Sequence, residues 1–259
     1  MPTPDLARSP DPNKASVCLS DLHLESADEP AFRTLSNQLA AAANAGHNVF
    51  LLGDLCEVWV GDDDDGPLAC AFRSLITSTS TRSFVGLMHG NRDFLFGERF
   101  AMETGAVLLP DPYPLGEQIL LSHGDRYCTD DTEYQQMRAL LRSKQWQESV
   151  LQQSLPERRQ LAAGLRQQSQ EASANKAANI MDVNAKVVAT EMAQESRGLL
   201  VHGHTHRPGR HQLDGFERLV LGDWAHTAWV AEIGAGVGYR AQSQPQLSAG
   251  VTLRCLPLA

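Results

Sequence analysis

Five short apolar runs along the chain each end in a cluster of polar residues. The runs cover residues 16–20, 49–52, 84–88, 119–121 and 199–201. Runs this short and this aliphatic are typical of strands buried in the centre of a sheet. Between the first two runs, apolar residues recur three or four positions apart from Phe32 to Ala42, which predicts a helix over residues 31–43 with one buried face. Strand and helix therefore alternate, and this order predicts an α/β fold with helices on the faces of a sheet.

The polar clusters all follow a predicted strand directly. In α/β sheets, ligands bind beyond the carboxyl ends of the strands. We therefore expect the five clusters to meet in space. Further strand-like runs follow at residues 218–221, 228–231 and 250–253.

Residues 129–196 have a different pattern. The stretch is rich in Gln, Ala, Arg, Leu and Glu, with only Pro156 and Gly164 as helix breakers, so it should be mostly helical. It separates two polar clusters that must meet, which favours an inserted helical cap over a linker. We therefore divide the chain into a disordered leader at 1–14, a core at 15–128 and 197–259, and a cap at 129–196.

Composition and charge limit the possible functions. Hydrophobic residues make up 42% of the chain and charged residues 20%, as in ordinary globular proteins, and no apolar run approaches the ~20 residues that span a bilayer. The net charge of −9 argues against a nucleic-acid binder with a broad basic surface. An acidic chain would also repel a phosphate substrate unless bound divalent cations reversed the local field.

The N-terminal segment and the cysteines predict a cytoplasmic protein. Residues 1–14 are rich in Pro and Asp and lack the apolar centre of a secretory signal. The five cysteines form no Cys-x-x-Cys pair, which indicates a reducing compartment without a disulfide framework. We expect all five to be small hydrophobic residues in or near the core.

Carboxylate, imidazole and amide side chains dominate the five clusters. They are Asp21 and His23, Asp54, Asn91, His123, and the pair His204 and His206. Asp-x-His, Gly-Asp and Gly-Asn are weak signals alone, because such residues often lie in loops without binding anything. The ordered set is specific, because a purely structural explanation needs five independent accidents.

The residue types explain the expected chemistry. Mixed oxygen and imidazole donors suit Mn²⁺, Fe²⁺ or Zn²⁺, and the two oxygens of Asp54 can bridge two cations. Two cations ~3.5–4 Å apart lower the pKa of a shared water and hold the attacking and leaving oxygens at phosphorus. The sequence therefore predicts a phosphoesterase with two divalent metal ions.

The five motifs resemble those of the calcineurin-like metallophosphoesterase superfamily, which implies a β-sandwich flanked by helices. One motif departs from the superfamily pattern, because Gly90-Asn91-Arg92-Asp93 has Arg where most members have a His that assists the leaving group. A guanidinium cannot act as a general acid near neutral pH, but it binds phosphate oxygens in a bidentate manner. The departure favours a diphosphate substrate over a monoester.

Longer motifs narrow the resemblance. The chain is similar to the UDP-2,3-diacylglucosamine pyrophosphohydrolase family over residues 15–230. The motifs that carry the similarity are His89-Gly90-Asn91-Arg92-Asp93-Phe94-Leu95, Val58-Trp59-Val60-Gly61-Asp62-Asp63-Asp64, His123-Gly124-Asp125 with Cys128-Thr129-Asp130-Asp131, Ile180-Met181-Asp182-Val183-Asn184, and His202-Gly203-His204-Thr205-His206-Arg207-Pro208.

The resemblance implies an activity, a cofactor and partners. Members use Mn²⁺ and water to attack the α-phosphorus of UDP-2,3-diacylglucosamine, which releases UMP and 2,3-diacylglucosamine 1-phosphate in lipid A synthesis. It further implies a cytoplasmic enzyme at the anionic lipid surface of the inner membrane, without nucleic acid or an obligate protein partner.

The resemblance also implies residue roles. One cation would be held by Asp21, His23, Asp54 and His206, and the other by Asp54, Asn91, His123 and His204. Substrate would be bound by Asn91, Arg92, Asp131, Arg166, Ser169, Ser173, Lys176 and His204. Of these, Arg92, Asn91 and His204 would be catalytic.

The cap has two interpretations. Apolar residues such as Leu140, Trp146 and Leu151 alternate with basic residues such as Arg138 and Arg158, as in any amphipathic helix with a solvated face. Together with the motifs, the same pattern favours an acyl-chain cleft with a basic rim that contacts anionic lipid headgroups.

Several polar residues receive no ligand role. The acidic run at residues 62–65 reads as a solvated loop with some helix capping. His89 and His202 are expected to be hydrogen-bonded beside the site, and Asp93 and Asp125 to orient Asn91 or His123.

Two other functions stay open at this point. A soluble metallophosphoesterase acting on a nucleotide or phosphoprotein would share the metal site but leave the cap and Arg92 unexplained. A catalytically silent metal-binding scaffold would be expected to lack a ligand, whereas all seven are present.

Overall fold

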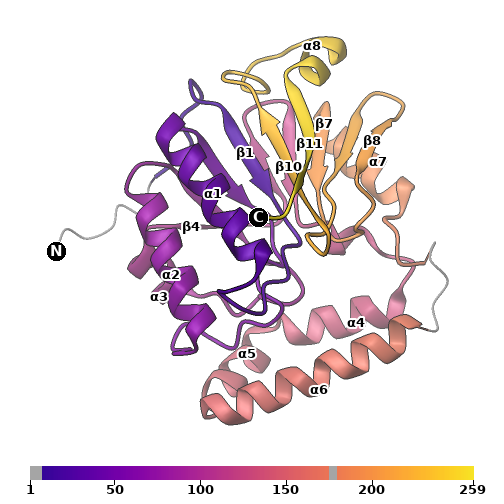
Figure 1. The fold of residues 1–259 in the computed structure, drawn as a ribbon. Coiled ribbons are helices and arrows are strands. Elements are labelled where there is room, and N and C mark those ends of the chain that lie inside the picture. The colour runs from indigo at the N-terminus through magenta and orange to yellow at the C-terminus, as the bar shows by residue number, and fades with distance from the viewer. Residues whose placement is uncertain (1–7, 175–179) are drawn as a thin grey trace.

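The computed structural model of the protein describes residues 8–174 and 180–259, and two β-sheets packed face to face form its centre (Figure 1). The first sheet has the order β11-β10-β1-β2-β3-β4 and the second the order β5-β6-β7-β9-β8. The first sheet contains β1 (Ser16–Leu19), β2 (Asn48–Leu51), β3 (Val85–Met88), β4 (Val107–Leu109), β10 (Thr227–Ile233) and β11 (Val251–Pro257). The second contains β5 (Tyr113–Leu115), β6 (Ile119–Ser122), β7 (Leu199–His202), β8 (Gly209–Gln212) and β9 (Glu217–Val220).

Parallel pairing in both sheets brings the predicted strand ends together. Strands β1 to β4 pair in parallel, as do β6, β7 and β9 in the other sheet. Phe50 and Met88 of the first sheet pack with Leu121 and Val201 of the second in one buried cluster. These strands are buried on both faces, so their sequences are continuous apolar runs.

Helices α1 (Pro30–Ala45), α2 (Pro67–Ser80) and α3 (Glu98–Thr104) cover the outer face of the first sheet. Leu35 and Leu39 of α1 are fully buried in the cluster that contains Val49 and Leu51 of β2. Helix α1 ends at Gly46, which has a φ of 69°, a left-handed conformation that glycine adopts without a steric penalty. The helix predicted over residues 31–43 is therefore confirmed.

Helix α7 (Ala185–Gln194) covers the outer face of the second sheet (Figure 1). Its Val188 and Met192 are buried with Leu120 of β6 and Leu200 of β7. Residues 185–194 are thus helical, as expected for the stretch 129–196, but their apolar face packs on the core sheet rather than within a separate cap. Small helix α8 (Gln244–Ala249) precedes β11.

Helices α4 (Thr132–Leu141), α5 (Lys144–Leu151) and α6 (Leu155–Ala174) lie together at one end of the sandwich (Figure 1), and we call these three helices the cap. No residue of α4 is buried, so apolar packing alone does not hold this helix in place. The predicted architecture, a two-sheet sandwich flanked by helices with a helical insertion, is confirmed.

Ion pairs join the cap to the core. Arg158 of α6 is 3% exposed and pairs with Asp63, and its Nη1 donates to the Val60 carbonyl at 2.6 Å. Arg159 pairs with Asp64 and Asp65. The acidic run predicted as a solvated loop is therefore largely an anchor for the cap.

The remaining predictions concern the ends of the chain and the cysteines. Within the predicted leader, residues 1–7 lie outside the described residues, whereas Arg8 donates to the Ser80 carbonyl at 2.9 Å and is thus tied to the core. Cys18, Cys56 and Cys128 are buried as expected, but the other two cysteines are exposed. Across residues 8–174 and 180–259, no helix has the length and apolar character needed to cross a membrane.

Candidate metal centre

The loops that follow β1 and β2 run side by side and bring the first two motifs together. Asp21 N donates to the Gly53 carbonyl at 3.1 Å, and His23 N donates to the Asp54 carbonyl at 3.0 Å. An isolated parallel bridge between Leu24 and Cys56 continues this pairing. The backbone therefore fixes Asp21, His23 and Asp54 as neighbours before any side chain interacts.

The candidate ligands have an unusual backbone conformation. Among the described residues, six non-glycine residues have a positive φ, and five of them are candidate ligands. These are Asp21 (57°), His23 (50°), Asp54 (53°), His204 (65°) and His206 (53°). Residues other than glycine are disfavoured at a positive φ, and backbone strain of this kind is concentrated at functional sites.

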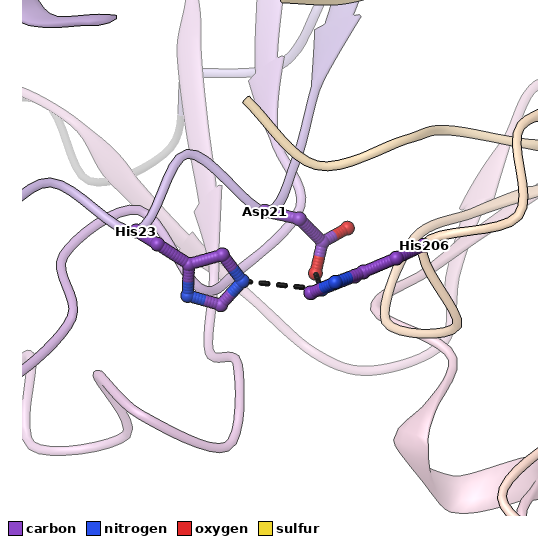
Figure 2. A group of neighbouring side chains, drawn as sticks. All are labelled: Asp21, His23 and His206. Carbon is purple, nitrogen blue, oxygen red and sulfur yellow. Dashed lines mark hydrogen bonds and ion pairs between the residues drawn. The ribbon is translucent and has the colours of Figure 1, made fainter. Parts of the chain in front are cut away.

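Asp21, His23 and His206 form the first donor group, in which the three side chains point toward one another (Figure 2). The two Nε2 atoms of His23 and His206 lie 3.1 Å apart, and His206 Nε2 lies 3.4 Å from Asp21 Oδ1. Asp21 is fully buried, and its Oδ1 makes no well-formed hydrogen bond within the described structure. A buried carboxylate oxygen in this state is a fitting ligand for a cation.

The carboxylates behind the two imidazole rings, on the side away from the centre, determine which ring nitrogen faces the centre. His23 Nδ1 lies 3.2 Å from Glu57 Oε2, and His206 Nδ1 lies 3.2 Å from Asp223 Oδ2. Carboxylates at these positions favour the proton on Nδ1, which leaves both Nε2 lone pairs facing each other. A bound metal ion resolves that repulsion, and carboxylates behind histidine ligands are typical of metal sites. The residues present therefore fit a divalent cation.

Asn91, His123 and His204 form the second donor group. Asn91 Oδ1 lies 3.1 Å from His123 Nε2 and 2.9 Å from His204 Nδ1. His123 Nδ1 donates to the Leu52 carbonyl at 2.9 Å, so its Nε2 is free to face the centre. Amide oxygen and imidazole nitrogen are donors that suit a divalent first-row metal, and Asp21, Asp54 and His123 bring ligand atoms within 4.8 Å of one another beside them.

Asp54 lies between the two groups. One oxygen, Oδ2, is 4.0 Å from His23 Nε2, and the other, Oδ1, is 3.8 Å from His123 Nε2. Asp54 is 2% exposed. A carboxylate with one oxygen toward each group has the position that the sequence predicts for a bridging ligand.

The buried carboxylates make the centre strongly negative. Burial lowers the pKa of His123, but the Asp54 and Asp125 carboxylates outweigh it and raise that pKa to about 9. Burial raises the pKa of Asp21, but contact with His206 outweighs this and lowers it well below its usual range. In His204, burial and the nearby His123 lower the pKa to about 4. The centre therefore attracts cations while keeping at least one imidazole neutral and able to bind metal.

Arg92 stands at the edge of the centre. Its backbone N–H donates to Asp54 Oδ1 at 2.9 Å, and its Nε lies 3.7 Å from Asp54 Oδ2. Its Nη1 donates to Glu57. The Arg92 side chain is 17% exposed, so it can meet a bound anion next to both donor groups.

Comparison with known proteins identifies the family. No family model matches the chain. A UDP-2,3-diacylglucosamine hydrolase from Cellvibrio japonicus is 41% identical over 228 residues, covering 85% of this chain and 95% of that protein. One from Salmonella schwarzengrund is 40% identical over 230 residues, with coverage of 85% and 95%. The chain belongs to the UDP-2,3-diacylglucosamine hydrolase family.

Solved structures add only a distant likeness to this family assignment. An archaeal phosphodiesterase matches with a TM-score of 0.48 and 9% identity, over 93% of this chain and 99% of that chain. Vacuolar protein sorting 29 from Cryptosporidium parvum matches with a TM-score of 0.44 and 13% identity, with coverage of 94% and 98%. Membership in the UDP-2,3-diacylglucosamine hydrolase family rests on the sequence relatives.

In this member of the family, three of the eight predicted substrate residues fall in α6 of the cap, namely Arg166, Ser169 and Ser173. Arg166 and Ser169 are one turn apart on α6, and Arg166 Nε contacts Glu57. Asp131 is buried and accepts from Tyr134 N at 3.1 Å, as the N-terminal cap of α4. Ser173 falls in α6, where its side chain is outside the described set, and Lys176 lies outside the described residues.

Two carboxylates of the centre were missed by the sequence analysis. Glu57 and Asp223 contact the Nδ1 atoms of His23 and His206. Asp223 follows Leu221-Gly222 at the end of β9, the same apolar-run-Gly-Asp pattern that marks Asp54. Glu57 has no comparable signal.

The carboxylates expected to orient ligands act through other partners. Asp93 accepts from the backbone N–H groups of Gly90 at 2.8 Å and Leu55 at 2.6 Å, so it shapes the loops rather than a ligand side chain. Burial and the nearby Asp54 raise its pKa to about 6. Asp125 accepts from Arg138 Nε at 2.7 Å and Tyr134 Oη at 2.9 Å and thereby joins α4 to the core.

The two flanking histidines behave as expected. His89 Nε2 lies 2.7 Å from the Phe96 carbonyl, and His202 Nδ1 lies 2.8 Å from the Gly203 carbonyl. Burial lowers the pKa of His202 to about 3, so it stays neutral inside the sandwich.

Proposed function

We propose that the chain hydrolyses the diphosphate of UDP-2,3-diacylglucosamine with water, releasing UMP and 2,3-diacylglucosamine 1-phosphate, a step of lipid A biosynthesis. The observation that carries this proposal is the pair of donor groups that meet at Asp54, with Arg92 beside them. The relatives at about 40% identity, which are named for this hydrolysis, support the choice of substrate.

We assign two divalent cations, Mn²⁺ by preference, to the two donor groups. Asp21, His23, Asp54 and His206 hold one, and Asp54, Asn91, His123 and His204 hold the other. When bound, the cations supply an acidified water and neutralise charge on the phosphate oxygens. The mixture of carboxylate, amide and imidazole donors supports a first-row metal of this kind.

Arg92, Asn91 and His204 act on the reacting phosphate. Arg92 binds an equatorial oxygen of the α-phosphate and offsets the charge that develops there. It does not donate a proton, because a guanidinium keeps its proton near neutral pH. None is needed, because the leaving group is itself a phosphate whose second pKa is about 6.

The cap positions the rest of the substrate. Arg166, Ser169, Ser173 and Lys176 are three or four positions apart in the sequence, and we assign these four residues, together with Asp131, to the diphosphate and sugar. Contact between Phe94 beside the centre and Trp146 on α5, with ring centroids 6.0 Å apart, supports an apolar path from the centre to the cap.

We further propose that the enzyme works in the cytoplasm and meets its lipid substrate at the anionic surface of the inner membrane. Six basic side chains of the described cap each have a carboxylate within 4 Å, so they are not unpaired cations that await lipid headgroups. They are Arg138, Arg142, Lys144, Arg158, Arg159 and Arg166. Exposed apolar side chains therefore give better support for membrane contact, namely Met137 (43%), Leu140 (53%) and Leu151 (44%).

One assay tests the proposal. Purified protein is incubated with UDP-2,3-diacylglucosamine and Mn²⁺, and UMP release is measured beside cleavage of a nonlipid phosphodiester. We expect UMP, with at least 100-fold losses in Asn91→Ala and His123→Ala, as second-group ligands. Cleavage of the nonlipid diester without UMP release would instead favour a soluble metallophosphoesterase. Full activity in either variant would contradict the assigned ligands.

A further inference from the structure

Glu57 joins three functional parts of the molecule through one carboxylate. It lies three residues after Asp54, and its backbone N–H donates to the Leu24 carbonyl at 3.0 Å. Its side chain is 16% exposed. Oε2 contacts Nδ1 of His23, while Oε1 contacts Arg92 from the loop after β3 and Arg166 from the cap.

The contact with His23 fixes the tautomer of a candidate metal ligand. A carboxylate at Nδ1 holds the proton on that nitrogen and turns the Nε2 lone pair toward Asp21 and His206. The contact also limits rotation of the ring, and such support typically changes metal affinity by about 10- to 100-fold.

The contacts with Arg92 and Arg166 bring together two guanidinium groups from different segments. Two such cations repel each other unless an anion lies between them. Glu57 supplies that anion and holds Arg166 beside Arg92, whose Nε lies 3.7 Å from Asp54 Oδ2. The arrangement is a preorganised anion-binding pair, with one arginine from the core and one from the cap.

We propose that Glu57 is a positioning residue that orients His23 toward its metal ion and holds Arg92 and Arg166 together for the diphosphate. The part that concerns His23 depends only on the metal centre. The part that concerns the arginines rests on the proposed function.

Glu57→Ala and Glu57→Gln separate the two roles. Alanine removes every contact, whereas glutamine keeps an oxygen that can lie beside His23 Nδ1 but carries no charge for the arginines. We expect Glu57→Ala to bind Mn²⁺ about 10- to 100-fold more weakly than the unchanged protein, and Glu57→Gln to regain most of that affinity. Both variants should lose about tenfold in kcat at saturating Mn²⁺, because Arg92 and Arg166 no longer share the carboxylate that holds them together.

Glu191→Ala is the matched control. Glu191 on α7 is 19% exposed and pairs with Arg126 at 2.6 Å, so it resembles Glu57 in burial and charge but contacts no candidate ligand in the described structure. Its loss should lower the melting temperature without changing Mn²⁺ affinity.

Mn²⁺ titration of the metal-free proteins, followed by water-proton relaxation, measures affinity without any substrate. This readout stays valid if the proposed substrate is wrong, in which case UMP release fails for the unchanged protein as well. Unchanged Mn²⁺ affinity in folded Glu57→Ala overturns the proposal. So does an equal loss in Glu191→Ala, or a Glu57→Gln variant that binds Mn²⁺ as weakly as Glu57→Ala.

Discussion

Gly90 packs directly against Asp54, the carboxylate shared by the two donor groups. A Cβ atom at position 90 would lie 2.1 Å from the Asp54 backbone N and 2.1 Å from its Oδ1, whereas ordinary contact begins at 3.4 Å. Gly90→Ala therefore forces these segments apart by roughly 1.3 Å, the difference between those distances. One of the two contacts is with backbone, so a side-chain rotation cannot relieve it.

The size of this displacement sets the expected loss of activity. Misplacing catalytic groups by about 1 Å typically costs about 100-fold in rate, and overpacking of this kind costs about 1–3 kcal/mol of stability. We expect Gly90→Ala to release UMP with a kcat/KM about 100-fold lower and to bind Mn²⁺ more weakly. Steady-state kinetics and Mn²⁺ titration measure both effects.

Gly164→Ala is the control for this substitution. Gly164 lies inside α6, and a Cβ there meets no atom within 4 Å. Alanine should therefore stabilise the protein by about 0.5–1 kcal/mol with no change in kcat/KM. A folded Gly90→Ala with unchanged kinetics and Mn²⁺ affinity would refute the packing argument.

Three further predictions concern the metal ions, the cap anchor and the acyl chains. A chelator should abolish UMP release and lower the melting temperature, because the Asp21 and Asp54 carboxylates lose their cations. Added Mn²⁺ should restore both the activity and the melting temperature. Activity that survives chelation contradicts the metal centre. Asp63→Asn removes the partner of Arg158 and should lower the free energy of unfolding by about 1 kcal/mol at pH 7, because Asp63 is half exposed. Arg158 lowers the pKa of Asp63 below 3.8, so this difference should be present above pH 3.8 and shrink as the pH falls below it, whereas a pH-independent difference argues against the ion pair. Trp146→Ala should reduce activity on the acylated substrate more than on a short-chain analogue, and equal losses would indicate a structural role only.

The strand ends and their polar residues were predictable because both signals are local. A buried strand requires a continuous apolar run, and the chain leaves the sheet where polar residues begin. Parallel strands then place Asp21, Asp54 and Asn91 at the same edge. The partition of the strands between two sheets is not local, because it depends on which faces pack together, and it was expected only through the resemblance to a superfamily.

Long-range pairs account for what the sequence did not reveal. Asp63 and Arg158 are 95 residues apart, and the local sequence around either residue does not indicate that it has a partner. The same holds for Glu57 and Arg166, whose contact depends on how the cap lies on the core. Helix α7 has the same composition as the cap helices. Its apolar face, which includes Val188, packs on the second sheet instead.

Hydrolysis in ¹⁸O-labelled water tests the central claim most directly. The products of UDP-2,3-diacylglucosamine with Mn²⁺ are separated, and the label in each is measured by mass spectrometry. Attack by water at the α-phosphorus, beside Asp54 and Arg92, predicts one ¹⁸O atom in UMP and none in 2,3-diacylglucosamine 1-phosphate. Label in the sugar phosphate, or no UMP at all, would contradict the account.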